Sequence, residues 1–186
     1  ASAEVEPVIV ATSEEERTVP QIRGGTARGL VLHKLIEEIL TGETDDAEVA
    51  MTERAGQLLN QLGIEAVNDP AAGYSPGEIA ASVARALALP EVMEVRPRLL
   101  PELSVAATNL QGDQEVATSG IADAVAHDDT GRIDTVVDWK SDVAPTNAQR
   151  ALYREQVRDY MVVVGASRGL IVYATEGAVD HVGERL

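Results

Sequence analysis

The first half of the chain carries apolar residues at the spacing of amphipathic helices. Apolar positions that recur three or four residues apart predict a helix over 27–41, with Thr26 as its N-cap. The same spacing predicts helices over 47–62 and 76–89, the last of which is closed by Pro90. The first half is therefore expected to be helical.

After Pro97 the pattern changes to β-branched runs that turn-forming residues separate. The runs "RLLPELSVAAT", "EVATSGIADAVAHD" and "RIDTVVDWKS" predict three successive antiparallel strands. Helical spacing returns over 147–165, and "RGLIVYAT" predicts a short buried strand. The order of three helices, three strands, helix and strand predicts one α/β domain with a mixed sheet flanked by helices.

Composition sets the limits of this domain. A length of 186 residues, with 45% apolar and 25% charged residues, is typical of one folded domain. The acidic, aperiodic start predicts a linker over 1–22 from a preceding region, and a folded domain over 23–186. Because no apolar run approaches the ~20 residues of a membrane helix, we expect no membrane association and a location in the bacterial cytosol or nucleoid.

Cysteine and net charge exclude several kinds of site. The absence of cysteine excludes disulfides, thiolate zinc sites and iron–sulfur clusters, so any metal would need oxygen or imidazole ligands. The net charge of -16 argues against a general affinity for nucleic acid. A nucleic-acid function would need local positive charge or metal ions.

Two charged residues interrupt the strand "VVDWKSD" at 136–142. Asp138 and Lys140 project from one face about 6.5 Å apart, and a solvated strand end with an ion pair is the ordinary explanation of such a motif when it stands alone. Asp123 interrupts the preceding strand and lies beside Asp138 if the two strands pair in suitable register. Since neighbouring carboxylates repel one another unless a proton or cation lies between them, the pair predicts a site for Mg²⁺ or Mn²⁺.

Two further residues are candidates for this site, and each has an ordinary alternative. Glu102 in "LLPEL" offers a third carboxylate, or it is a solvated residue of a sheet edge. His33 lies on the same side of its helix as Leu30 and Ile36, with Glu37 one turn further. It is either a metal ligand or a core histidine.

The helix over 147–165 carries two neighbouring stripes of residues. They are Tyr153, Gln156 and Tyr160 in the first, and Arg150, Arg154 and Arg158 in the second. The first stripe is compatible with packing or with a site. Because like charges four residues apart oppose helix formation, the arginines suggest an anionic partner.

In this order, the segments resemble the PD-(D/E)XK nuclease superfamily, specifically the RecB-like exonuclease domains of superfamily 1 (UvrD-like) DNA helicases of the AddA and RecB kind. "GGTARGLVLHKLIEE" matches a Gly-Thr followed by a helical His, and "LLPEL" matches a Glu-bearing strand. "GIADAV" matches a Gly-x-x-Asp strand and "VVDWKSD" an Asp-x-Lys strand, and a Tyr-x-x-Gln-x-x-x-Tyr helix follows. The resemblance spans roughly 23–175 and implies a restriction-endonuclease-like core.

The resemblance also implies roles for the matched residues. Asp123, Asp138 and the carbonyl of Trp139 would bind one or two Mg²⁺ or Mn²⁺ ions, His33 would add an imidazole ligand, and Glu102 would complete the shell. Lys140 would orient the attacking water or stabilise charge on the phosphate.

Substrate contacts are expected from the helix that follows. By the resemblance, Gln156 and Tyr160, with Tyr153 beside them, would bind the DNA backbone. That Arg154 and its neighbouring arginines hold further phosphates is inferred from the charge pattern alone.

The implied function is a Mg²⁺-dependent DNA exonuclease domain of a helicase-nuclease in double-strand break repair and recombination. Its expected partners are a single DNA strand delivered by the linked helicase, and other helicase-nuclease subunits. Two alternatives stay open at this point. One is an inactive nuclease-fold module that binds single-stranded DNA or docks on the helicase, and the other is a metal-dependent hydrolase of another substrate.

Overall fold

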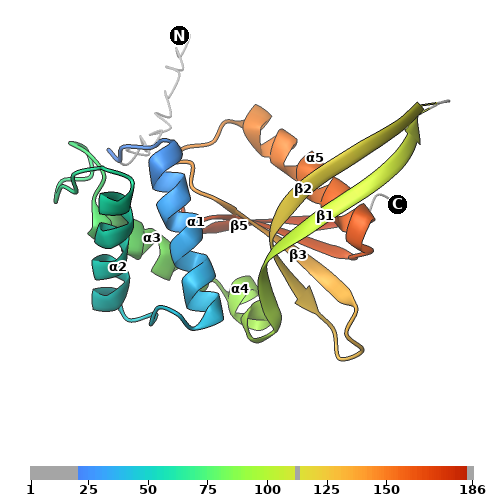
Figure 1. Cartoon of the computed structure of the whole chain (residues 1–186), viewed down its shortest axis with the longest axis horizontal. Coiled ribbons are helices and arrows are strands. Elements are labelled where there is room, and N and C mark those ends of the chain that lie inside the picture. Colours follow the sequence, from blue (N-terminus) through green and yellow to red (C-terminus); the bar gives the residue numbers. More distant parts are fainter. Residues whose placement is uncertain (1–20, 112–113, 184–186) are drawn as a thin grey trace, which may run out of the picture.

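The chain folds into a five-stranded sheet with helices on both faces (Figure 1). The computed structural model describes residues 21–111 and 114–183, and of residues 105–111 and 114–119 it describes the backbone alone. The expected linker over 1–22 falls almost wholly outside the described residues and stays a prediction. No helix of the described part is both long and apolar enough to span a membrane.

In the part of the chain that the structure describes, four helices precede the first strand, and a fifth lies between the third and fourth strands. They are α1 (Thr26–Thr41), α2 (Glu48–Gln61), α3 (Pro76–Leu87), α4 (Pro90–Val95) and α5 (Asn147–Val164), with the 3-10 turn η1 (Arg96–Arg98) after α4. Local chemistry fixes the ends of α5, because Thr146 and Gln149 form a reciprocal capping box and Gly165 ends the helix at a φ of 73°.

The strands form one mixed sheet in chain order. They are β1 (Leu99–Gln111), β2 (Gln114–His127), β3 (Ile133–Lys140), β4 (Arg168–Tyr173) and β5 (Ala178–Gly183). All neighbours pair antiparallel except β3 and β4, which are parallel and are joined by the crossover helix α5. The predicted mixed α/β sheet is confirmed.

Each face of the sheet packs against its own layer of helices. On one face, α1 to α4 cover an apolar core that includes Val137 and Trp139 of β3. On the other face, α5 covers a smaller core that includes Val136 of β3, and α5 itself buries only Val157 and Met161. The residues of β3 therefore alternate between the two layers, as the period-two pattern predicted.

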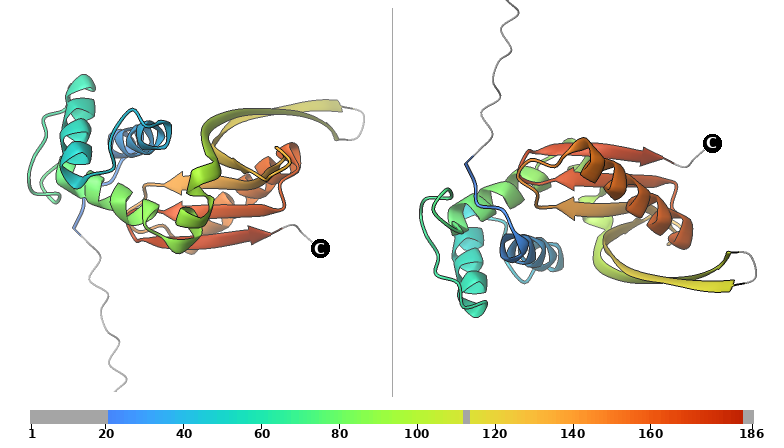
Figure 2. Two further views of the ribbon diagram at one scale, coloured as in Figure 1. Left: turned by 90° about the horizontal axis from the view of Figure 1, so that it is seen from below. Right: turned by 90° about the horizontal axis from the view of Figure 1, so that it is seen from above.

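The strands β1 and β2 extend beyond the sheet as a long two-stranded arm (Figure 2). Their pairing continues from Leu99↔Ala126 to Gln111↔Gln114, whereas β2 pairs with β3 only as far as Ala124↔Val137. A fork therefore opens between β2 and β3 directly after that pair.

The structure corrects three details of the sequence interpretation. Gly25, at a φ of 127°, occupies the N-cap in place of Thr26, which is the first helical residue. The helix expected to reach 89 ends at Leu87, because Pro90 begins the separate helix α4 as its first residue. The strand β5 was not predicted, since its alternating polar residues form no apolar run.

Candidate active site

The candidate site lies at the fork between β2 and β3. Continuing the register of the last backbone pair sets Asp123 opposite Asp138. The Trp139 backbone N–H donates a hydrogen bond of 2.8 Å to Asp123 Oδ2, so this carboxylate takes the place of a strand carbonyl. The strand register that would bring Asp123 beside Asp138 is therefore present.

Asp138 and Lys140 form a buried ion pair on the face of β3 that points to α5. Asp138 is only 4% exposed, and Lys140 Nζ lies 2.8 Å from its Oδ2. The same ammonium lies 3.4 Å from Gln156 Oε1 and 4.2 Å from the centre of the Tyr153 ring. Three side chains from β3 and α5, those of Asp138, Tyr153 and Gln156, thus fix the position of this lysine.

The surroundings of Asp138 disfavour the ionised form of its carboxyl group. Its pKa is raised to about 6, chiefly by burial; the charge of Lys140 opposes this rise, and the charge of the nearby Asp123 contributes to it. The approach of Lys140 does not have hydrogen-bond geometry, so the buried Oδ2 atom has a charged neighbour but no directed donor. A cation beside this carboxylate would stabilise its ionised form.

His33 reaches Asp123 from helix α1. Its Nδ1 atom lies 3.5 Å from Asp123 Oδ1, which is the oxygen that the Trp139 N–H leaves free. Burial alone would lower the pKa of His33, but the hydrogen bond and charge of Asp123 reverse this and raise the pKa above its ordinary value. The His33 side chain is 38% exposed and is paired with Asp123. It is therefore not a fully buried core histidine.

A small hollow connects α1 with the three strands. It measures about 20 Å³, and its lining includes His33, Glu37, Glu102, Asp123 and Trp139. Glu102 lies on β1 between the pairs Pro101↔Ala124 and Leu103↔Ala122, which sets it opposite Asp123. Glu37 was not among the predicted site residues, although its position four residues after His33 on the same helix face signals it.

The backbone of Glu102 is unusual. Its φ of 52° lies in the left-handed region, which residues other than glycine rarely adopt, and it is the one such residue in the described part. This conformation falls within a strand and beside the carboxylates. Backbone strain of this kind concentrates at functional sites.

The aromatic and amide stripe of α5 also faces this region. The Tyr153 hydroxyl donates a hydrogen bond of 3.1 Å to Asp142, and burial together with this bond raises the pKa of Tyr153. Gln156 Nε2 donates to the Tyr160 hydroxyl over 3.2 Å. Gly120 of β2 passes so close to Tyr160 that a Cβ atom there would lie 2.7 Å from its hydroxyl oxygen.

A family model described as the PD-(D/E)XK nuclease superfamily matches residues 11–179, which is most of the chain. The chain belongs to the PD-(D/E)XK nuclease superfamily. No curated protein is significantly similar to it in sequence. A solved structure titled "Crystal structure of SSO0001" shows 18% identity and a TM-score of 0.42 over 87% of this chain and 80% of that chain.

Members of this superfamily typically use divalent metals, and the donors at the fork fit such an ion in kind. Carboxylate and imidazole groups suit Mg²⁺ or Mn²⁺, and Asp138 Oδ2 is a buried oxygen without a directed donor. The hollow is large enough for about one water-sized particle. As the described residues stand, no three His, Asp or Glu side chains lie close enough together to hold a metal.

The arginine stripe of α5 lies away from this site. Arg154 Nη2 donates a 2.7 Å hydrogen bond to Asp180 of β5, and Arg150 pairs with Glu176 and lies over the Tyr173 ring at 3.9 Å. The structure therefore does not bring Arg154 to the predicted substrate group. These acidic partners, Glu176 before β5 and Asp180 on it, were not predicted because no apolar run follows β4 in the sequence.

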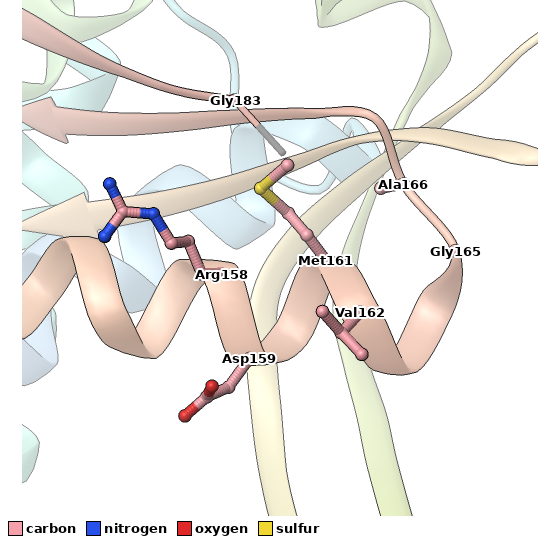
Figure 3. Close-up of a pocket in the computed structure, with 7 residues that line it drawn as sticks. All are labelled: Arg158, Asp159, Met161, Val162, Gly165, Ala166 and Gly183. Atoms are coloured by element: carbon pink, nitrogen blue, oxygen red, sulfur yellow. The ribbon is translucent and has the colours of Figure 1, made fainter. Parts of the chain in front are cut away.

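A larger hollow of about 510 Å³ lies near the end of α5 (Figure 3). Arg158 and Met161 point from α5 toward the sheet there, whereas Asp159 and Val162 point away. None of the fork residues lines this hollow. The charged side chains of the candidate site therefore converge at the fork and not at this larger hollow.

Proposed function

We propose that this domain is a metal-dependent DNA exonuclease of the RecB-like kind, the nuclease part of a helicase-nuclease that acts in double-strand break repair and recombination. The observation that carries the proposal is the position of Lys140, which Asp138, Gln156 and Tyr153 hold beside the Asp123 and His33 pair. Residues 23–186 would form the nuclease domain, preceded by a linker.

The reaction requires an in-line attack of water on a phosphodiester that repels nucleophiles. A bound Mg²⁺ or Mn²⁺ would neutralise phosphate charge and acidify water. Asp123, Asp138, His33 and the Trp139 carbonyl would hold the ion, and Glu102 would complete the set.

The chain's own residues would position the other reactants. Lys140 has three N–H donors on a buried stem, so it can donate to the attacking water or to a phosphate oxygen while Asp138 holds it. Gln156 and Tyr160, which contact one another, would bind the DNA backbone next to the lysine.

The strong negative charge of the chain fits this proposal only if DNA is delivered to the site. With a net charge of -16, the domain repels phosphates at long range. A linked helicase that feeds one strand into the fork would overcome this repulsion. We therefore propose single-stranded DNA as substrate and helicase-nuclease subunits as partners.

The test is degradation of end-labelled single-stranded DNA with Mg²⁺ or Mn²⁺. We expect cleavage of linear but not circular strands, and a loss of about 10³-fold in Lys140→Ala, because a positioned group that acts on the transition state contributes about 10²–10⁴-fold. Arg168→Ala is the matched control, since it removes a positive charge at the opposite end of the paired strands. DNA binding without cleavage by the wild type would instead identify an inactive binding module.

A further inference from the structure

A buried arginine joins the end of the Asp-x-Lys strand to two helices. Arg28 of α1 is 1% exposed, and its Nη1 atom donates a 2.5 Å hydrogen bond to the carbonyl of Ser141, the residue after Lys140. Its Nε and Nη2 atoms bind α3, where they donate to the two oxygens of Glu78 at 2.9 and 2.6 Å. Nη2 also bonds Ser82 Oγ at 3.0 Å.

The same carbonyl is part of a wider set of contacts at the ends of the parallel strands. Thr175, just after β4, donates to the Ser141 carbonyl over 3.3 Å, and the Ala174 N–H donates to the Lys140 carbonyl over 3.0 Å. Arg85 of α3 donates to the carbonyls of Ala174 and Thr175. Two arginines thus bind carbonyl groups directly after the ends of both strands.

Helix α1 also approaches this strand end through its backbone. A Cβ atom on Gly29 would lie 2.9 Å from Ser141 Oγ, so only glycine permits this approach without a shift. His33 follows on the same helix slightly more than one turn later. The contact at Ser141 therefore sets how α1 lies against β3, and with it how His33 lies against Asp123.

Stability alone does not explain this arrangement. Burying an ion pair removes two charged groups from water, and apolar residues of equal volume are often as stable. A second arginine of the fold serves as a comparison. Arg54 of α2 binds both oxygens of the buried Glu38 at 2.7 Å, and among the described residues it makes no hydrogen bond to a strand. Of these two arginine–carboxylate pairs, only that of Arg28, whose side chain is 1% exposed against 27% for Arg54, bonds the segment that follows Lys140.

We infer that Arg28 is a positioning residue for the proposed nuclease site, where its guanidinium fixes the end of β3, and thereby Lys140, relative to His33 on α1. Glu78 and Ser82 orient the guanidinium. The inference rests on the proposed function for its catalytic consequence, but its structural part can be measured without catalysis.

The experiment compares Arg28→Lys with Arg54→Lys, two substitutions that retain the charge and remove the planar donor fork. Trp139 lies between Asp138 and Lys140 and is the only tryptophan of the chain, so its fluorescence reports on this part of β3. We expect Arg28→Lys to increase acrylamide quenching of Trp139 and to lower kcat by about 10- to 100-fold at nearly unchanged KM, because small misplacements cost up to about 10²-fold. Arg54→Lys should change neither quantity.

Several results would overturn the inference. Unchanged kcat and Trp139 quenching in a folded Arg28→Lys protein would do so, as would equal kcat losses in both variants. If Arg28→Lys does not fold, Ser82→Ala, which removes one bond to the guanidinium, should show the same changes in smaller size, and their absence would be decisive. If the wild type cleaves no DNA, the proposed function fails, whereas the difference in Trp139 quenching still tests the positioning.

Discussion

The two faces of β3 differ in what they contribute to the protein. Toward α1 to α4, Val137 and Trp139 join a continuous apolar core. Toward α5, Asp138 and Lys140 form a buried ion pair with polar neighbours. Because successive side chains of a strand point to opposite faces, the eight residues of β3 form both the apolar face and the charged face. The core contacts and the charged contacts therefore depend on neighbouring but separate positions.

The helices that cover the two faces differ in the same way. Helix α1 buries seven of its residues, most of them apolar, whereas α5 buries only Val157 and Met161. Polar contacts from Tyr153, Gln156 and Arg154 connect α5 to its neighbours instead. Substitutions on the first face should therefore reduce stability, and substitutions on the second should reduce activity.

The largest expected effect on stability comes from the apolar face. Trp139→Ala should lower the free energy of unfolding by about 3–5 kcal/mol, because it leaves a large cavity in a packed core. Urea denaturation followed by circular dichroism measures this change. Val162→Ala, at a position 79% exposed, is the control and should change stability by less than about 0.5 kcal/mol. Equal effects of the two substitutions would contradict the comparison.

An intermediate effect with the opposite sign is expected from Asp138→Asn in metal-free protein. Between pH 3.8 and about 6, the folded state retains a proton that the unfolded state has released, so the contribution of this group to stability falls as pH rises through that range. Above pH 6, Asn avoids a cost on the order of 3 kcal/mol, since the pKa rises from 3.8 to about 6 and one pKa unit corresponds to about 1.36 kcal/mol. The variant should therefore melt higher than wild type at pH 8.

Melting curves at pH 4 and pH 8 in the presence of a chelator test this prediction. At pH 4 the advantage of Asp138→Asn should shrink, because the wild-type carboxyl is then protonated. Asp46→Asn, at a surface ion pair, is the control for removing a charge. Added Mn²⁺ should stabilise the wild type and not Asp138→Asn. A variant less stable than wild type at pH 8 would refute the assigned cost.

The smallest expected effects separate the two stripes of α5. Gln156→Ala should lower DNA cleavage by about tenfold, since the amide contacts Lys140 and Tyr160 and a lost contact to a charged group is equivalent to about 1.5 kcal/mol. Arg154→Ala should leave cleavage within about twofold and cost at most about 1 kcal/mol of stability, as surface ion pairs do. Steady-state cleavage rates and melting temperatures measure both. A larger loss in Arg154→Ala would restore the arginine stripe as a substrate contact.

The sequence predicted the order of the main elements because their patterns are local. Apolar spacing locates α1 and α5, and β-branched runs locate β1 to β3. The positions of Asp138 and Lys140 on one face followed from strand geometry alone. The local pattern offered His33 and Glu102 only as candidates with ordinary alternatives, and it was the family resemblance that assigned them to the metal site.

The remaining features depend on tertiary contacts that no local pattern shows. The short helix α4 and the strand β5 have weak periodicity, and without β5 the acidic partners of Arg154 were absent from the interpretation. The bond from Trp139 to Asp123 needs the register of two strands, which the sequence offered only as a condition. Glu37 had a signal in its spacing from His33, but that signal is shared by many surface residues.

The two carboxylate oxygens of Asp123 have different partners. One oxygen closes the sheet where the backbone ladder stops, and the other faces His33. A substitution that retains the shape of the fork therefore still alters the charge that reaches the imidazole. A substitution of Asp123 therefore affects the joining of β2 to β3 and the pKa of His33 together.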